Sequence, residues 1–454
     1  MKPLSTIPAT SGWRRTIRLL NSILRPLAFM EERTQKYGDF YQVTFKNAPP
    51  TVMTSNPRAI EEILTASEDT FEVGRGNQGL KFLVGDHSLL LLDGKTHQNR
   101  RRLLMPSFHG EALQKCSSQI VETTQEITAN WRINQPFKVR RVMQEITLRV
   151  ILKAIFGQDS GERYTRLREL LTNLLEIFNI PLTAIFIFFP SLQKDLGRLS
   201  PWGRFLAWKK EIKTLIYEEI QERRERLSSG QEQATDILSL LLLAKDEDGL
   251  PLTDEELHDE LITLLFAGHE TTASALSWLF YWVHSLPEVQ DKLRFELNSI
   301  GDLSDYKTIN KLPYLDAVIS ETLRIYPIAA TTFARILTKP KRIMGYDFAP
   351  KTWFMMSVYS LHHREDLYPN PKQFQPERFL QKTYSLYEYL PFGGGNRRCL
   401  GSALALLEMK LVTATILQQF QLELTSKKPM FPVRRGLTIA PPAYFSIKVK
   451  GLNN

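Results

Sequence analysis

The stretch Pro391–Gly401, which reads P-F-G-G-G-N-R-R-C-L-G, decides how the rest of this 454-residue chain is interpreted. A run of three glycines and two arginines precede Cys399, and a strong helical pattern follows it. Cys399 is therefore predicted at or just before a helix N-terminus, where unpaired amides and the helix dipole stabilise a thiolate over a thiol. Such a thiolate is a nucleophile or a metal ligand, and the structural alternative is a small buried cysteine beside a turn. The glycines predict that backbone there lies against something flat or large.

Composition bounds the type of protein. The sequence is 43% apolar and shows no Gly/Ser-rich spacer, low-complexity run or internal repeat, so residues 1–454 are expected to form a single domain and to act as a monomer. Cys116 and Cys399 cannot build a disulfide framework, and the N-terminus does not resemble a signal peptide, which favours the cytoplasm. The net charge of +9 favours an acidic protein partner, although a scattered basic surface is the simpler alternative, and no nucleic-acid partner is expected.

Two stretches bear on membranes. The strongly apolar run Ile180–Pro190 is shorter than the ~20 residues that span a bilayer, so no transmembrane anchor is expected. Near the start, Arg14–Arg25 (R-R-T-I-R-L-L-N-S-I-L-R) mixes cations with apolar residues. Peripheral contact of this stretch with a membrane surface stays open beside the reading as an ordinary amphipathic helix.

The secondary-structure pattern is mostly helical. Residues Gly38–Thr54 and Arg342–Val358 alternate like short strands, so a small β-rich portion is expected mainly at about residues 38–60 and 335–360. The longest helical pattern follows the capping box T-D-E-E at Thr253 and runs to Leu286, just ahead of a proline. At 1.5 Å per residue, a helix of roughly 50 Å must cross the body of the protein.

The motif A-G-H-E-T-T, residues Ala267–Thr272, lies halfway along this helix. Glycine and two threonines weaken a helix, and the Thr271 hydroxyl is placed to bond the Ala267 carbonyl one turn earlier. With no side chain at Gly268, a small groove is predicted. The alternative is a close contact between helices that needs a small residue.

The spacing F-x-x-G-x-R-x-C-x-G comprises Phe392, Gly395, Arg397, Cys399 and Gly401. It resembles the heme-binding loop of the cytochrome P-450 superfamily, in which a cysteine thiolate is the axial iron ligand. A-G-H-E-T-T is similar to that family's oxygen-binding helix motif, and E-T-L-R and P-E-R-F resemble two further family motifs in the family's order. The resemblance implies a mainly α fold with a small β-rich subdomain, and heme b as the cofactor.

The resemblance also implies roles for charged residues. The pattern alone predicts an exposed pair of Glu321 and Arg324, with Arg378 elsewhere. The resemblance implies instead that the three residues form a buried cluster that fixes the fold around the heme loop. His97 and Arg101, one helical turn apart in residues Gly94–Phe108, are similar to the family's propionate-binding pair. Arg335 and Arg397 match further propionate contacts. For the neighbouring Arg100 and Arg102, a solvated basic face and a docking surface for an acidic electron donor stay open.

The implied reaction is insertion of one oxygen atom of O2 into a C–H bond, or epoxidation, because thiolate ligation favours O–O cleavage. Glu270 and Thr271 are expected to face the groove and to relay protons. By resemblance, a lipophilic substrate such as a fatty acid, alkane or terpenoid meets Phe71–Leu92, Phe178–Leu192, Leu261–Ala267 and Ile328–Phe333, with room left by two alanines, Ala329 and Ala330. Electrons are expected from an acidic ferredoxin or flavodoxin. A peroxide-dependent hydroxylase and a non-catalytic heme sensor are the alternatives.

A zinc site is not expected. His269 and Glu270 begin a zinc-protease pattern, but Ala273 stands where the second histidine is required. The adjacent pair His362 and His363 is expected in a polar loop without cysteine ligands.

Overall fold

A computed structural model gives the structure of the chain. Its described residues are 7–9, 21–22, 24–44, 49–158, 160–179, 193–197, 200–231, 233–247, 249–301, 303 and 305–453. The two stretches considered above for a relation to membranes fall largely outside these residues, namely most of Arg14–Arg25 and all of Ile180–Pro190. Among the helices of the described part, none combines enough length and hydropathy to cross a bilayer.

The described part is mainly helical, as the sequence predicts. Its α-helices are α2 (Pro26–Tyr37), α3 (Pro57–Leu64), α4 (Lys81–Val84), α5 (Gly94–Leu104), α6 (Glu111–Thr128), α7 (Val139–Phe156), α8 (Glu162–Asn179), α10 (Pro201–Ser228), α11 (Ile237–Leu243), α12 (Asp254–Ser285), α13 (Pro287–Leu297), α14 (Tyr306–Ile309), α15 (Pro313–Ile325), α16 (Val358–His362), α17 (Arg378–Gln381) and α18 (Ser402–Gln419).

The strands form separate small sheets: β1 (Phe40–Val43), β2 (Thr51–Thr54), β3 (Phe71–Glu72), β4 (Pro136–Lys138), β5 (Arg335–Leu337), β6 (Lys341–Ile343), β7 (Tyr346–Phe348), β8 (Trp353–Met356), β9 (Phe420–Leu424), β10 (Val433–Arg435), β11 (Thr438–Ala440) and β12 (Ser446–Leu452). A five-stranded sheet has the order β1-β2-β8-β5-β3, in which β2 and β8 are parallel and the other neighbours antiparallel. The pairs β6–β7 and β10–β11 are hairpins, and β4, β12 and β9 form a third sheet.

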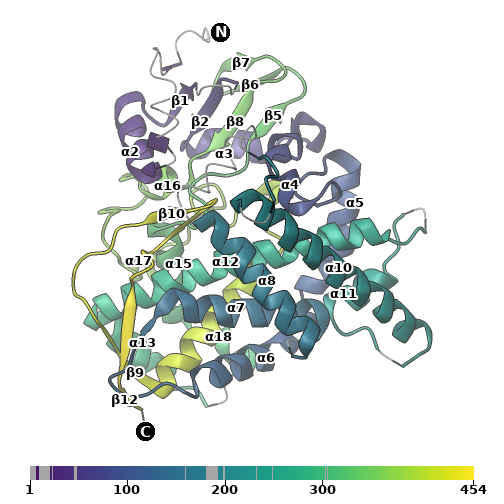
Figure 1. Cartoon of the computed structure of the whole chain (residues 1–454). Coiled ribbons are helices and arrows are strands. Elements are labelled where there is room, and N and C mark those ends of the chain that lie inside the picture. Colours follow the sequence, from purple (N-terminus) through teal and green to yellow (C-terminus); the bar gives the residue numbers. More distant parts are fainter. Residues whose placement is uncertain are drawn as a thin grey trace.

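Helix α12 crosses the helical part of the molecule, while the five-stranded sheet lies at the opposite end from the C-terminus (Figure 1). The capping box predicted for α12 is present: Thr253 Oγ1 accepts from the Glu256 amide at 3.2 Å, and Glu256 Oε2 accepts from the Thr253 amide at 2.9 Å. The helix packs on α7, α15 and α18 and is buried on nearly all sides. At 32 residues and 1.5 Å per residue it is roughly 48 Å long, as predicted.

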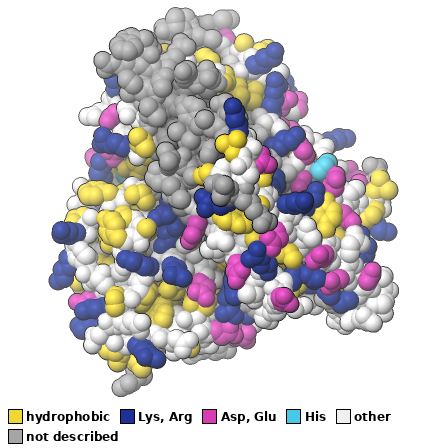
Figure 2. All heavy atoms as spheres, viewed as in Figure 1, with side chains coloured by type: hydrophobic (Ala, Val, Ile, Leu, Met, Phe, Trp, Pro, Cys, Tyr) yellow, Lys and Arg dark blue, Asp and Glu magenta, His cyan; other side chains and the backbone are white. Residues whose placement is uncertain are grey.

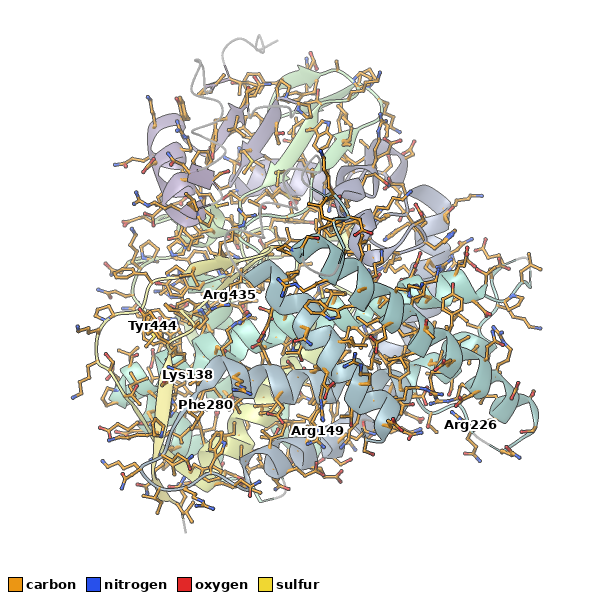
Figure 3. All side chains as sticks on the ribbon, in the orientation of Figure 1. Lys138, Arg149, Arg226, Phe280, Arg435 and Tyr444 are labelled. Atoms are coloured by element: carbon orange, nitrogen blue, oxygen red, sulfur yellow. The ribbon has the colours of Figure 1, made fainter. Side chains whose placement is uncertain are left out.

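The strands only partly follow the sequence prediction. Most of the five-stranded sheet comes from the two expected ranges, but helix α3 begins within the first of them. The sheet of β4, β9 and β12 and the β10–β11 hairpin lie elsewhere and were not predicted. In the third sheet's neighbourhood, Lys138 Nζ donates to the Tyr444 carbonyl at 3.2 Å, and both residues are labelled in Figure 3.

Candidate active site around Cys399

Cys399 lies three residues ahead of α18, where the sequence places it. Its amide donates to the Phe392 carbonyl at 2.9 Å, which closes the loop on itself. The residue is exposed, yet protein surrounds the sulfur so closely that burial raises the pKa of the thiol. These two facts agree if the sulfur borders a space inside the molecule. The prediction that the helix N-terminus favours the thiolate was wrong for the protein alone, because burial outweighs the Gly401 amide and the charges of Arg101 and Arg398.

Two glycines of the loop, Gly394 and Gly395, lie close to other parts of the protein. Gly395 has a φ of 65°, and a Cβ there would lie 2.8 Å from the Leu64 carbonyl oxygen. A Cβ on Gly394 would lie 2.7 Å from a Leu64 methyl group. The packing of the loop on Leu64, the last residue of α3, therefore leaves no room for a side chain at either glycine. The expectation that the loop backbone also lies against something flat or large stays a prediction. Gly401 has ordinary space around it, with Phe108 at 3.9 Å.

The middle of α12 has one accessible side. Ala267 is exposed, and Phe266, Gly268 and Thr271 beside it are partly exposed, whereas most other residues of the helix are buried. The Thr271 hydroxyl donates to the Ala267 carbonyl at 2.5 Å, as predicted. Gly268 serves a different purpose, since a Cβ there would lie 2.9 Å from Ile151 Cδ1 on α7. It provides the close helix contact that was the alternative to a groove.

Glu270 does not share the accessible side with Thr271, which corrects the expectation. Its carboxylate is buried, pairs with Arg140 and accepts from Gln144 Nε2 at 3.0 Å, both on α7. Successive residues on a helix point about 100° apart, so one neighbour faces α7 while the other faces the open side. Sequence reasoning missed Arg140 and Gln144, because nothing local to either motif links residues so far apart in the chain.

A second arginine belongs to the surroundings of Glu270. Arg435, labelled in Figure 3, is the last residue of β10. Burial and the charge of Arg140 lower its pKa, while Glu270 and Glu176 oppose that shift. The buried carboxyl group of Glu270 therefore lies near cationic side chains from α7 and from the β10–β11 hairpin.

Four basic side chains gather beside the cysteine loop, all of which the sequence singled out: His97, Arg101, Arg335 and Arg397. Burial, then the charges of Arg397 and Arg101, lower the pKa of His97 to about 3, so the imidazole is neutral. Burial and Arg397 lower the pKa of Arg335 to about 10, and burial lowers that of Arg397 to about 10. Among described residues, Asp93 is the one carboxylate bonded to any of the four. The cluster therefore carries uncompensated positive charge.

These residues fit heme. The Nε atoms of Arg335 and Arg397 are buried and have no hydrogen-bond partner within the described part of the chain. Two free donors in a cationic cluster suit the two carboxylates that heme carries. Cys399 would hold the heme iron through its sulfur, because a thiol loses its proton when it binds a metal even where burial raises its pKa. No group of three or more His, Cys, Asp or Glu side chains in the described residues could hold a separate metal ion.

The predicted buried cluster around Arg324 is confirmed. Arg324 and Glu321 are fully buried and joined by two bonds, of 2.6 Å from Nε and 2.8 Å from Nη2. Arg378 Nε reaches Glu321 Oε1 at 3.2 Å, and the Gln375 amide donates to the same oxygen at 2.8 Å. Arg324 Nη1 also donates to the His362 carbonyl at 2.8 Å. The cluster thus joins α15 to α16 and to the segment before α17.

One histidine and one arginine differ from expectation. His362 lies at the buried end of α16, where Nε2 accepts the Leu390 amide at 2.8 Å, and not in a polar loop. Arg100 is neither solvated nor available for docking, since it is buried against Glu256 and Glu260. Arg102 is exposed and pairs with Glu247.

The predicted substrate-contacting segments are only partly accessible. Ala329 and Phe333 are exposed, whereas Ala330 is buried in a small core with Leu27, Tyr359 and Ile439. Ala330 therefore leaves no open space, contrary to expectation. Nearly all of residues 178–192 lies outside the described residues.

Comparison with known proteins identifies the family. The sequence model of the family described as Cytochrome P450 matches residues 18–448. Cytochrome P450 135B1 of Mycobacterium tuberculosis is 34% identical over 445 residues, which cover 98% of this chain and 90% of that protein. Cytochrome P450 135A1 of the same species is 35% identical, with 91% of this chain and 88% of the relative covered.

Solved structures share the fold. A cyanobacterial CYP120A1 with bound retinoic acid superposes with a TM-score of 0.82 at 24% identity, covering 98% of each chain. The heme domain of cytochrome P450DA has the same TM-score of 0.82 at 23% identity, with 99% of this chain and 97% of that chain covered. The chain belongs to the cytochrome P450 family. It is a heme-thiolate monooxygenase whose cofactor is heme b.

Proposed function

We propose that the enzyme hydroxylates or epoxidises a lipophilic substrate of the fatty-acid, alkane or terpenoid class. The observation that carries this proposal is the exposure of Ala267 in the middle of a helix that is mostly buried. Ala329 and Phe333 add accessible apolar surface from the segment after α15. Accessible apolar side chains at these positions suit a ligand that is itself apolar.

In the proposed site, Cys399 would hold the heme iron through its sulfur. The heme carboxylates would be bound by His97, Arg101, Arg335 and Arg397. Phe392 and Gly401 shape the loop. Ala267 borders the cofactor, and Gly268 would border it through its backbone alone, because the side-chain position of Gly268 faces Ile151 on α7. When bound, heme supplies oxygen activation favoured by its thiolate ligand. Thr271 places its hydroxyl at the accessible side of α12, whereas Arg140 holds the Glu270 carboxylate away from that side.

Two absorption measurements test the site and the substrate class. The reduced, carbon-monoxide-bound spectrum of the purified protein should show thiolate ligation, and Cys399→Ser should lose it. Titration with fatty acids, alkanes and terpenoids, including retinoic acid, should give a spin-state shift with at least one class. If only polar compounds produced the shift, the lipophilic assignment would be wrong.

A separate acidic ferredoxin or flavodoxin is the proposed electron donor. The net charge of +9 supports electrostatic steering of such a carrier. On the face in Figure 2, basic and acidic side chains are intermingled, so that view offers no single basic patch. The rate of heme reduction by the carrier should fall as salt is raised from about 0.05 to 0.5 M, where screening removes steering. A rate independent of ionic strength would contradict this.

A peroxide-dependent hydroxylase is the second candidate. The engagement of Glu270 by Arg140 favours it, because the acid and the alcohol do not lie together on the open side. Product formation with hydrogen peroxide alone, at a rate matching that of the complete electron-transfer system, would establish this alternative.

We also propose that the protein works in the cytoplasm as a monomer with one domain. Both cysteines are unpaired, which suits a reducing compartment. Size-exclusion chromatography and cell fractionation test these points directly.

A further inference from the structure

Asp93 occupies the N-cap position of α5 but does not cap that helix. An aspartate there normally accepts from the first amides of its own helix. Here Oδ1 accepts from the Val73 and Gly74 amides, each at 2.8 Å, and Oδ2 accepts from the Arg75 amide at 2.9 Å. The Asp93 carboxylate therefore binds the backbone of a segment about twenty residues earlier in the chain. Helix capping does not explain why an aspartate stands at this position.

The same carboxylate holds one end of Arg397. Arg397 Nη2 donates to Asp93 Oδ1 at 2.7 Å and to the Leu92 carbonyl at 2.6 Å, and Nη1 reaches the Leu89 carbonyl at 3.4 Å. The third nitrogen, Nε, is buried and has no partner among the described residues. A planar guanidinium fixed at both terminal nitrogens has a fixed plane, so the direction of the free Nε–H is fixed as well.

Charge makes this restraint necessary. Arg397 lies in the field of Arg101 and Arg335, and mutual repulsion contributes to the lowered pKa of Arg335. Without a nearby anion, a buried arginine in such a cluster would be pushed out of its place. Asp93 is the described carboxylate that makes direct contact with Arg397.

We propose that Asp93 is a positioning residue for the cofactor: it holds Arg397 so that the free Nε–H points at a heme carboxylate. It also ties that arginine to residues 73–75, so heme retention depends on a side chain that need not touch the heme. This inference rests on the proposed role of Arg397 in binding heme.

The test is a double-mutant cycle on the heme-loaded, full-length protein. Asp93→Asn, Arg397→Gln and the double variant are compared by the rate of heme transfer to an excess of an apoglobin. Asn77→Ala is the matched control, because Asn77 Nδ2 holds the same segment through the Leu90 carbonyl at 3.0 Å without touching Arg397. Asp93→Glu tests rescue by a side chain that keeps the carboxylate.

Asp93→Asn should speed heme loss about tenfold, the size of one lost hydrogen bond to a charged group. Asn77→Ala should stay within about twofold of the parent, since it removes a neutral bond. In the Arg397→Gln background, Asp93→Asn should add nothing, because Asp93 acts through Arg397. Asp93→Glu should be slower to lose heme than Asp93→Asn.

Different failures have different meanings. If Arg397→Gln leaves heme loss unchanged, the proposed role of Arg397 fails. If Arg397→Gln matters but Asp93→Asn does not, or if the two effects add in full, Asp93 is not a positioning residue. Equal losses in Asn77→Ala and Asp93→Asn would show general loosening of the segment and would overturn the inference too. Should Asp93→Asn retain no heme on purification, Asp93→Glu takes its place in the cycle.

Discussion

Replacing Arg324 with alanine should prevent accumulation of the heme-loaded protein. The variant leaves Glu321 buried with Arg378 as its remaining charged partner, at 3.2 Å, and frees the carbonyl of His362. Removing one member of a buried ion pair costs about 3–5 kcal/mol. Typical domain stabilities are about 5–15 kcal/mol, so the folded fraction should fall by roughly 10²- to 10⁴-fold relative to the unfolded one.

The control is Arg342→Ala. Arg342 makes the same two-bond contact with a carboxylate, at 2.9 and 3.1 Å from Asp347, but that pair is exposed. Exposed pairs contribute about 0–1 kcal/mol, so this variant should behave like the parent. The assay is heme absorbance per mole of purified protein, followed by urea unfolding of whatever folds. A soluble Arg324→Ala protein with full heme content and an unchanged urea midpoint would refute the reasoning.

Three further predictions concern α12. Gly268→Val should lower the free energy of unfolding, measured by thermal unfolding, by about 1–3 kcal/mol, because the new side chain overlaps Ile151. Ile151→Ala should restore part of that free energy. Equal losses with Ile151 and with Ala at position 151 would contradict the contact. Burial raises the pKa of Glu260 to about 7, so the folded protein should lose stability, by about 3 kcal/mol at most, as pH rises from the usual carboxyl range to about 7. In Glu260→Gln, the free energy of unfolding measured in urea should not show this decrease with pH. Thr271→Ala should consume NAD(P)H and oxygen with little product, as product yield per NAD(P)H will show.

The parts of the site that the sequence predicted depend on short spacings. Glu321 and Arg324 are three apart on α15, and Thr271 and Ala267 are four apart on α12, so helix geometry alone brings each pair together. The capping box at Thr253 is local in the same way. Such contacts follow from the chain's own geometry once the helix is identified.

The parts that failed depend on contacts between distant segments. The orientation of Glu270 is set by Arg140, and the need for Gly268 by Ile151, both on α7. Arg100 resembles its exposed neighbour Arg102 in sequence, but only the packing of α5 on α12 buries it. The pKa of Cys399 depends on how much protein surrounds the sulfur, and the spacing of residues in the sequence does not predict that burial.

The parallel pairing of β2 with β8 joins residues 51–54 to residues 353–356. At synthesis rates of about 5–20 residues per second, the earlier strand waits roughly 15–60 s for its partner to be made. During that interval a nascent chain exposes an unpaired strand edge, which is open to association with other chains. Production of the intact enzyme should therefore respond to the speed of translation and to chaperone supply more than its helical content would suggest.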